Sequence, residues 1–104
     1  MNNKMQVTLI TTEGNIKKVN IKTFKDAKHF VSKDHYESPI EILTMSDGRI
    51  MLLDEEGKLK GLEYNEEATI RAKDDNLIYP SDFIVGNVII IDDVDEFDSL
   101  AYQE

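Results

Sequence analysis

The chain has no cysteine and no tryptophan, and only two of its 104 residues are proline. Without cysteine it can form neither disulfide bonds nor thiolate metal sites, and it has no cysteine nucleophile. No apolar run is longer than four residues, whereas a membrane-spanning helix needs about 20. Residues 1–6 have no apolar stretch typical of a signal peptide. These features favour a cytosolic protein, and no membrane partner is expected.

Positive charge is scarce beyond the first third of the chain. Residues 1–33 carry seven lysines against two acidic residues, whereas residues 34–104 carry five basic and nineteen acidic residues. Because nonspecific nucleic-acid binding requires a basic surface, direct binding of DNA or RNA is not expected. One alternative stays open, a nucleic-acid surface made of the early lysines: Lys17, Lys18, Lys22, Lys25, Lys28 and Lys33.

The apolar residues, 40% of the chain, suffice for one small core. Residues 5–12 and 16–21 are rich in β-branched residues around Gly14 and predict a hairpin. Thr23 and Asp26 then have the spacing of a capping box, which predicts a helix ending between residues 32 and 35. The side chains of this helix expected to face the core are Phe24, Ala27, Phe30 and Val31.

A second hairpin is predicted from residues 39–45 and 50–53. They flank Asp47-Gly48, a pair favoured in the two-residue type I′ turn. Residues 82–91 are apolar on both faces, as in a strand buried on both sides, and Gly86 indicates a bulge or a close backbone approach. Weaker patterns predict a short helix near Asn65 and one helical turn within residues 96–102, which would bury Phe97 and Leu100.

These elements predict an α+β fold. The sheet is expected to be antiparallel or mixed, with about five strands and one main helix packed on a face. Residues 1–104 are expected to form a single domain, with residues 92–104 as an acidic C-terminal segment.

Two segments carry a more specific pattern. Residues 55–68 place glycine, leucine and asparagine at fixed spacing, at Gly57, Leu59, Gly61, Leu62 and Asn65. Residues 82–90 combine an aspartate, two apolar residues, a glycine and an apolar strand. Both segments resemble the signature of a small uncharacterised family, a domain of unknown function common in bacterial phages, plasmids and other mobile elements. With the preceding hairpin, the resemblance extends over about residues 39–100, and it implies that the family's usual N-terminal strand lies at residues 5–12.

The resemblance implies a genomic context rather than a reaction, because the family has no established activity. Two positions depart from the signature: Glu63 stands where proline is common and Glu66 where arginine is common. If that arginine serves an anionic ligand in the family, this chain has lost or reversed the contact.

The glycines of residues 57–65 have two interpretations. Paired glycines most often answer backbone needs, so the loop is expected to bury Leu59 and Leu62 and to cap a helix with Asn65. The alternative is a small-ligand or nucleotide site close to Gly86, formed by Gly57, Lys58, Gly61 and Asn65.

No catalytic, cofactor or metal pattern is present. His29 is expected on the polar face of the first helix and His35 in a loop, and a metal site needs at least about three ligands at fixed spacing. Residues 57–61 lack the order of a phosphate-binding loop. Residues 93–104 place Asp98 where a calcium loop requires glycine. The chain is therefore not expected to be an enzyme or to bind a cofactor.

The acidic residues are the feature of the sequence that most favours a binding function. The partner surface expected from them comprises Asp54, Glu55, Glu56, Asp92, Asp93, Asp95, Glu96 and Asp98. Such a surface could imitate nucleic-acid phosphates and bind a basic groove, or it could only keep the protein soluble. The sequence thus predicts a non-enzymatic module that binds a host or element protein, with the small-ligand module as the alternative.

Overall fold

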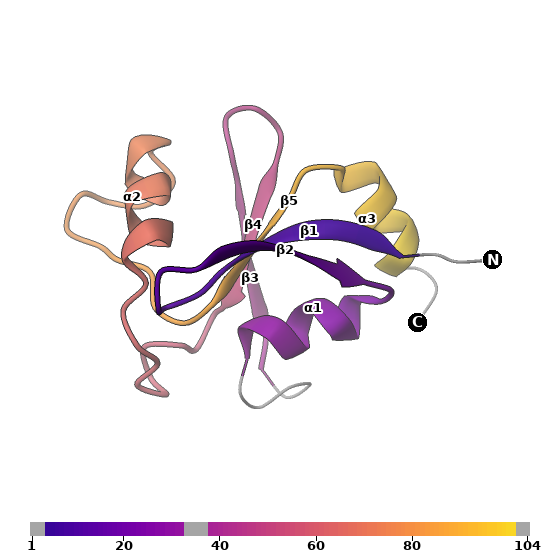
Figure 1. The fold of residues 1–104 in the computed structure, drawn as a ribbon. Helices are drawn as coiled ribbons and strands as arrows, with labels where there is room; N and C mark the ends of the chain where they lie inside the picture. Colours follow the sequence, from indigo (N-terminus) through magenta and orange to yellow (C-terminus); the bar gives the residue numbers. More distant parts are fainter. Residues whose placement is uncertain (1–3, 33–37, 102–104) are drawn as a thin grey trace.

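The computed structural model of the protein describes residues 4–32 and 38–101. It contains a five-stranded sheet, shown in Figure 1. The strands are β1 (Met5–Ile10), β2 (Ile16–Ile21), β3 (Ile40–Thr44), β4 (Ile50–Asp54) and β5 (Val88–Ile91). Their order is β2-β1-β5-β4-β3, and every neighbouring pair is antiparallel. The predicted α+β fold is confirmed.

Both predicted hairpins are present, but the turn between β3 and β4 is not the expected one. A type I′ turn needs positive φ at both central residues. Gly48 has a φ of +94°, whereas Asp47 is not in the positive range. The Gly48 N–H donates to the Met45 carbonyl at 3.0 Å, and the Met45 N–H donates to the Arg49 carbonyl at 2.7 Å. The connection is therefore a longer one, in which a turn is followed by a left-handed glycine.

Three helices accompany the sheet: α1 (Phe24–Val31), α2 (Glu66–Asp74) and α3 (Val94–Ala101). The predicted capping box opens α1, because the Asp26 N–H donates to Thr23 Oγ1 and the Thr23 N–H donates to Asp26 Oδ2. α3 is longer than the predicted turn, and it buries Phe97 and Leu100 as expected. None of the helices in the described ranges is long and apolar enough to cross a membrane.

Each face of the sheet carries an apolar core. One core joins α1 and α3 to the sheet through Ala27, Val31, Phe97, Leu100, Leu9 and Ile89. The other joins α2 to the opposite face through Ala68, Ala72, Ile10 and Ile90. Figure 1 shows α2 well apart from α1 and α3. The sequence predicted one main helix on one face, whereas the structure covers both.

β5 lies at the centre of the sheet, between β1 and β4. All four of its residues are buried, which confirms a strand buried on both sides. It is shorter than the predicted residues 82–91, because residues 82–87 form a loop with a single bridge between Tyr64 and Val85. Gly86 has a φ of +78°, and a Cβ there would lie 2.8 Å from Leu62 Cδ1. The predicted close approach at Gly86 is confirmed.

Candidate functional site

Asn65 fixes the loop that leads into α2. Its side chain is fully buried, and its Nδ2 donates to the Ile10 carbonyl at 3.1 Å and to the Gly86 carbonyl at 2.9 Å. Its Oδ1 accepts from the Ala68 N–H at 3.1 Å and caps α2, as predicted. These bonds tie the loop to β1, to the segment before β5 and to α2 at once. The polar atoms of the Asn65 side chain are thus used within the fold.

The rest of the expected binding loop divides between buried and exposed residues. Gly57 is buried, and a Cβ there would lie 2.9 Å from Val85 Cγ2, so a close approach explains this glycine. Lys58 and Gly61 are exposed. The predicted burial of Leu59 is wrong, because its side chain is 89% exposed. The loop needs Gly57 and Asn65 to hold its backbone, and it presents Leu59 to solvent.

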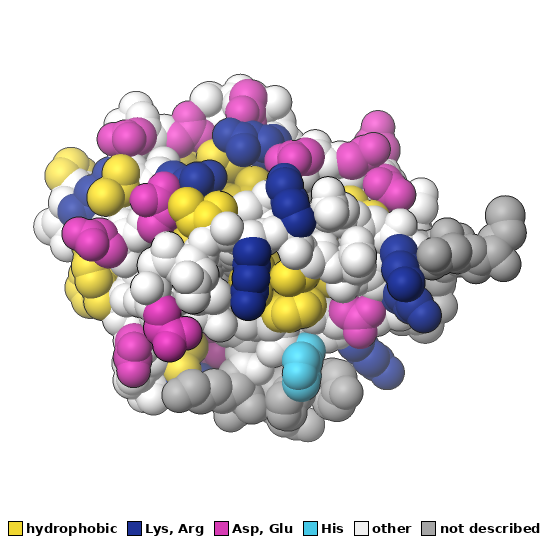
Figure 2. All heavy atoms as spheres, in the orientation of Figure 1, with side chains coloured by type: hydrophobic (Ala, Val, Ile, Leu, Met, Phe, Trp, Pro, Cys, Tyr) yellow, Lys and Arg dark blue, Asp and Glu magenta, His cyan; other side chains and the backbone are white. Residues whose placement is uncertain are grey.

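The same loop contributes to an exposed surface, which we call the Phe83 surface: Lys58, Tyr64 and Phe83. Tyr64 and Phe83 are 52% and 42% exposed, and their ring centroids lie 6.1 Å apart. Lys58 Nζ lies 4.4 Å from the centroid of the Phe83 ring and pairs with Asp82. Figure 2 shows hydrophobic side chains mixed with acidic and basic ones on the surface at the α2 end of the molecule. Apolar side chains that stay exposed together are typical of interaction sites.

Acidic residues outnumber basic ones around the Phe83 surface. Residues 54–67 include six acidic residues and two lysines. Both lysines are engaged, since Lys58 pairs with Asp82 and Lys60 Nζ lies 2.8 Å from Asp54 Oδ2. The acidic residues here that remain exposed or half-buried are Glu55, Glu56, Glu63, Glu66 and Glu67. Glu67 pairs with Arg71 at 2.8 Å. Glu55 lines one hollow with Lys58 and Phe83, and Glu63 directly precedes Tyr64. These two glutamates make their part of the rim of the Phe83 surface negative.

The Lys58–Asp82 pair should make the stability of the fold depend on pH. The hydrogen bond from Lys58, followed by that from the Phe83 N–H, holds the pKa of Asp82 below its ordinary value of 3.8. Because the folded pKa is lowered, the pair stabilises the fold above pH 3.8, and this contribution is lost as the pH falls through the folded pKa. Lys58→Met should raise the pKa of Asp82 toward 3.8, as measured by carboxyl NMR titration.

Asp47 provides the control for that titration. Its pKa is also lowered, chiefly by the Arg49 backbone N–H, and Lys58 is not among the causes. The Asp47 pKa should therefore be the same in both proteins. An Asp82 pKa that does not move in Lys58→Met would contradict the assignment.

The expected acidic partner surface does not form one surface. Asp54 does not belong to it, because its side chain is 0% exposed and bonded to Lys60. Glu55 and Glu56 follow the end of β4, whereas Asp92 follows the end of β5. β4 and β5 are antiparallel, with Ile50 opposite Ile91, so these acidic groups lie at opposite ends of β4. The second group is exposed around the start of α3 and comprises Asp92, Asp93, Asp95, Glu96 and Asp98.

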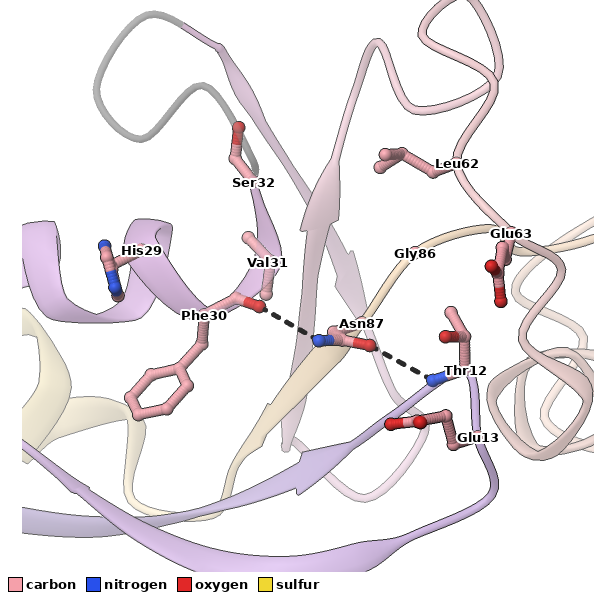
Figure 3. A pocket seen from close by; sticks show the side chains of 10 residues that line it. All are labelled: Thr12, Glu13, His29, Phe30, Val31, Ser32, Leu62, Glu63, Gly86 and Asn87. Carbon is pink, nitrogen blue, oxygen red and sulfur yellow. Dashed lines mark hydrogen bonds between the residues drawn. The ribbon is translucent and has the colours of Figure 1, made fainter.

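A separate cavity of about 470 Å³, which we call the Asn87 pocket, opens where four segments meet. Its lining comprises Thr12, Glu13, His29, Phe30, Val31, Ser32, Leu62, Glu63, Gly86 and Asn87 (Figure 3). Asn87 Oδ1 accepts from the Thr12 N–H at 3.1 Å, and its Nδ2 donates to the Phe30 carbonyl at 3.5 Å. Asn87 thereby joins the end of β1 to the end of α1. The cavity volume is within the range of small-molecule sites.

The fold and these two sites can now be compared with known proteins. A family model described as a domain of unknown function, DUF3846, matches residues 5–104. The chain belongs to this family. Neither the curated proteins nor the solved structures contain a match to it. The match confirms the resemblance at the level of an uncharacterised domain and includes the expected N-terminal strand, and it extends the related region to β2 and α1.

The histidines and the early lysines of this DUF3846 domain are not central to the Phe83 surface or to the Asn87 pocket. His29 is exposed on α1 and lines the Asn87 pocket, whereas His35 lies outside the described residues. Within the described ranges, no three His, Asp or Glu side chains are grouped to hold a metal ion. The lysines considered for nucleic acid lie on β2 and α1 or just before α1, except Lys33, which is outside the described residues.

Neither the exposed aromatic pair nor the pocket of the DUF3846 domain is indicated by a pattern in the sequence. Tyr64 and Phe83 meet because one backbone bridge pairs residue 64 with residue 85, which leaves no periodic signal. The pocket depends on Asn87, an isolated residue before an apolar strand. Of the residues that line the pocket, Gly86 is the one whose sequence context indicated a ligand site nearby. It lines the pocket with Leu62 from the loop.

Proposed function

We propose that this DUF3846 domain is a non-enzymatic protein-binding module and that the Phe83 surface contacts the partner. The observation that supports this proposal most directly is the exposure of Tyr64 and Phe83 side by side, next to the negative part of the rim. Interfaces commonly bury aromatic anchors at their centre and match charges at their rim. The partner is accordingly a protein with an apolar recess and basic residues around it.

The partner is proposed to be a host protein or another protein of a phage, plasmid or other mobile element. The resemblance noted in residues 55–68 and 82–90 supports this context. The first test of this proposal is the identity of the genes beside the one that encodes this domain. Phage or plasmid genes beside this one would support the proposal, and an ordinary chromosomal operon would contradict it.

A narrower form of the proposal is imitation of nucleic-acid phosphates. It would use the exposed acidic group at the start of α3, because Glu55 and Glu56 lie at the other end of β4. A DNA or RNA duplex should then compete with the domain for the partner. Binding that is indifferent to added duplex would contradict this form and leave the Phe83 surface in place.

Phe83→Ser tests the Phe83 surface. The native domain should retain a partner from host lysate, and Phe83→Ser should weaken binding of that purified partner by about 30-fold or more, as expected for a buried aromatic anchor. Tyr79→Ser is the matched control, because Tyr79 is 80% exposed and is not part of the Phe83 surface. Circular dichroism checks that both variants fold. No partner at any salt concentration, or equal binding by Phe83→Ser, would contradict the proposal.

A second candidate function is small-ligand binding, and the Asn87 pocket favours it. The pocket includes none of the loop residues predicted for this role, which are Gly57, Lys58, Gly61 and Asn65. It does include their neighbours Leu62 and Glu63, together with Gly86. A ligand that binds the folded state raises the melting temperature. A thermal-shift screen of metabolites therefore tests this candidate.

A further inference from the structure

We propose that the Asn87 pocket binds an alkyl guanidinium group, a planar cation on an apolar stem. The inference rests on the second candidate function and is independent of the Phe83 surface. The two sites use different residues of one short segment. Tyr64 belongs to the Phe83 surface, whereas Leu62 and Glu63, directly before it, line the pocket.

The acidic side chains in the lining of the pocket favour a cationic ligand. Glu13 reaches the pocket from the turn between β1 and β2, and Glu63 reaches it from the loop before α2. Figure 3 shows the Glu13 side chain extending toward the α1 side and Glu63 lying beside Thr12. No lysine or arginine is among the residues found to line the pocket. The negative end of the α1 dipole also borders it, since residues 29–32 close one side.

The pocket offers both polar and apolar groups, as this ligand requires. Asn87 is held in place by its bonds to Thr12 and Phe30, so it stiffens the wall. Leu62, Phe30 and Val31 offer apolar surface for an alkyl stem. A guanidinium is preferred to an ammonium because it is more weakly hydrated, can stack on an aromatic ring and can bind a carboxylate with two parallel hydrogen bonds.

The guanidinium could come from a free metabolite or from an arginine side chain of a partner protein. Agmatine represents the free compound, and Nα-acetylarginine amide represents the side chain in a peptide. Nα-acetylcitrulline amide has nearly the same shape without the charge. Calorimetric titration in mildly alkaline buffer, where histidine is largely neutral, compares the three probes on the intact domain.

Both guanidinium probes, or one of them, should bind, and the citrulline compound should bind at least about tenfold more weakly. The variant Glu13→Gln/Glu63→Gln should lower guanidinium affinity by about tenfold, since each carboxylate is exposed and contributes modestly. Glu55→Gln/Glu56→Gln is the matched control, because it removes the same charge from two exposed sites outside the pocket. It should bind like the native domain.

Amide NMR shifts should locate the bound probe at Gly86 and Asn87. Tighter binding of agmatine would identify a free ligand, and tighter binding of the arginine amide would identify a partner's side chain. Equal binding of the citrulline compound, full affinity in Glu13→Gln/Glu63→Gln, or no binding of either cation would overturn the inference. Phe83→Ser should leave these titrations unchanged, so failure of the pocket is distinguishable from failure of the Phe83 surface.

Discussion

Asn65→Ala is expected to lower the free energy of unfolding by at least about 3 kcal/mol. The substitution removes the cap of α2 and leaves the Ile10 and Gly86 carbonyls without the donor that satisfies them. Losing a cap costs about 1 kcal/mol, and each buried carbonyl that loses its partner costs about 1–3 kcal/mol. Urea unfolding followed by far-ultraviolet circular dichroism measures the change.

Two further variants make this expectation specific. Asn65→Asp keeps an oxygen for the Ala68 N–H but loses both donors, so it should also be strongly destabilised at neutral pH. It should recover part of its stability in acid, where a protonated carboxyl can donate one bond. Asn20→Ala, at an exposed position of β2, should change stability by less than about 0.5 kcal/mol. A loss below about 1 kcal/mol in Asn65→Ala would contradict the role assigned to these bonds.

Lys60→Met should destabilise the fold by about 3 kcal/mol. The Asp54 side chain is 0% exposed, and its oxygens accept from Lys60 Nζ and from the Glu56 N–H, both at 2.8 Å. Removing the ammonium leaves a buried carboxylate with one backbone donor, and an uncompensated buried charge is costly. Chemical denaturation of the native and variant domains measures this cost.

The double variant Asp54→Asn/Lys60→Met separates the charge from the packing. It should be more stable than Lys60→Met alone, because the buried group is then neutral. Lys58→Met serves as the control for loss of a lysine, since the Lys58–Asp82 pair is partly exposed and should contribute less than about 1 kcal/mol. If Lys60→Met and Lys58→Met cost the same, the buried position of Asp54 has no energetic consequence.

The elements that could be predicted from the sequence are those fixed by local chemistry. The two hairpins follow from β-branched or apolar runs on either side of a glycine turn, and the start of α1 follows from Thr23 and Asp26. The central position of β5 was indicated because all four of its residues are apolar, which suits a strand covered on both faces. In these cases neighbouring residues alone carry the physical cause.

The errors arise where distant segments decide the outcome. Asp54 reads as an exposed acid in the sequence, but it ends the fully buried strand β4 and pairs there with Lys60. Leu59 reads as a core residue, yet its exposure follows from a loop path that is fixed by the contact of Gly57 with Val85. The Asn87 pocket could not be predicted, because its lining comes from four separate segments.

The position of β5 also has a consequence for the order in which the protein can be made. Each hairpin is continuous in sequence and can form on its own, but β1 and β4 are joined only through β5, which follows both hairpins in the chain. During translation, the sheet hydrogen bonds that connect the two hairpins therefore cannot form until residues 88–91 have been made. A nascent chain stalled before that point would be a natural target for chaperones and proteases.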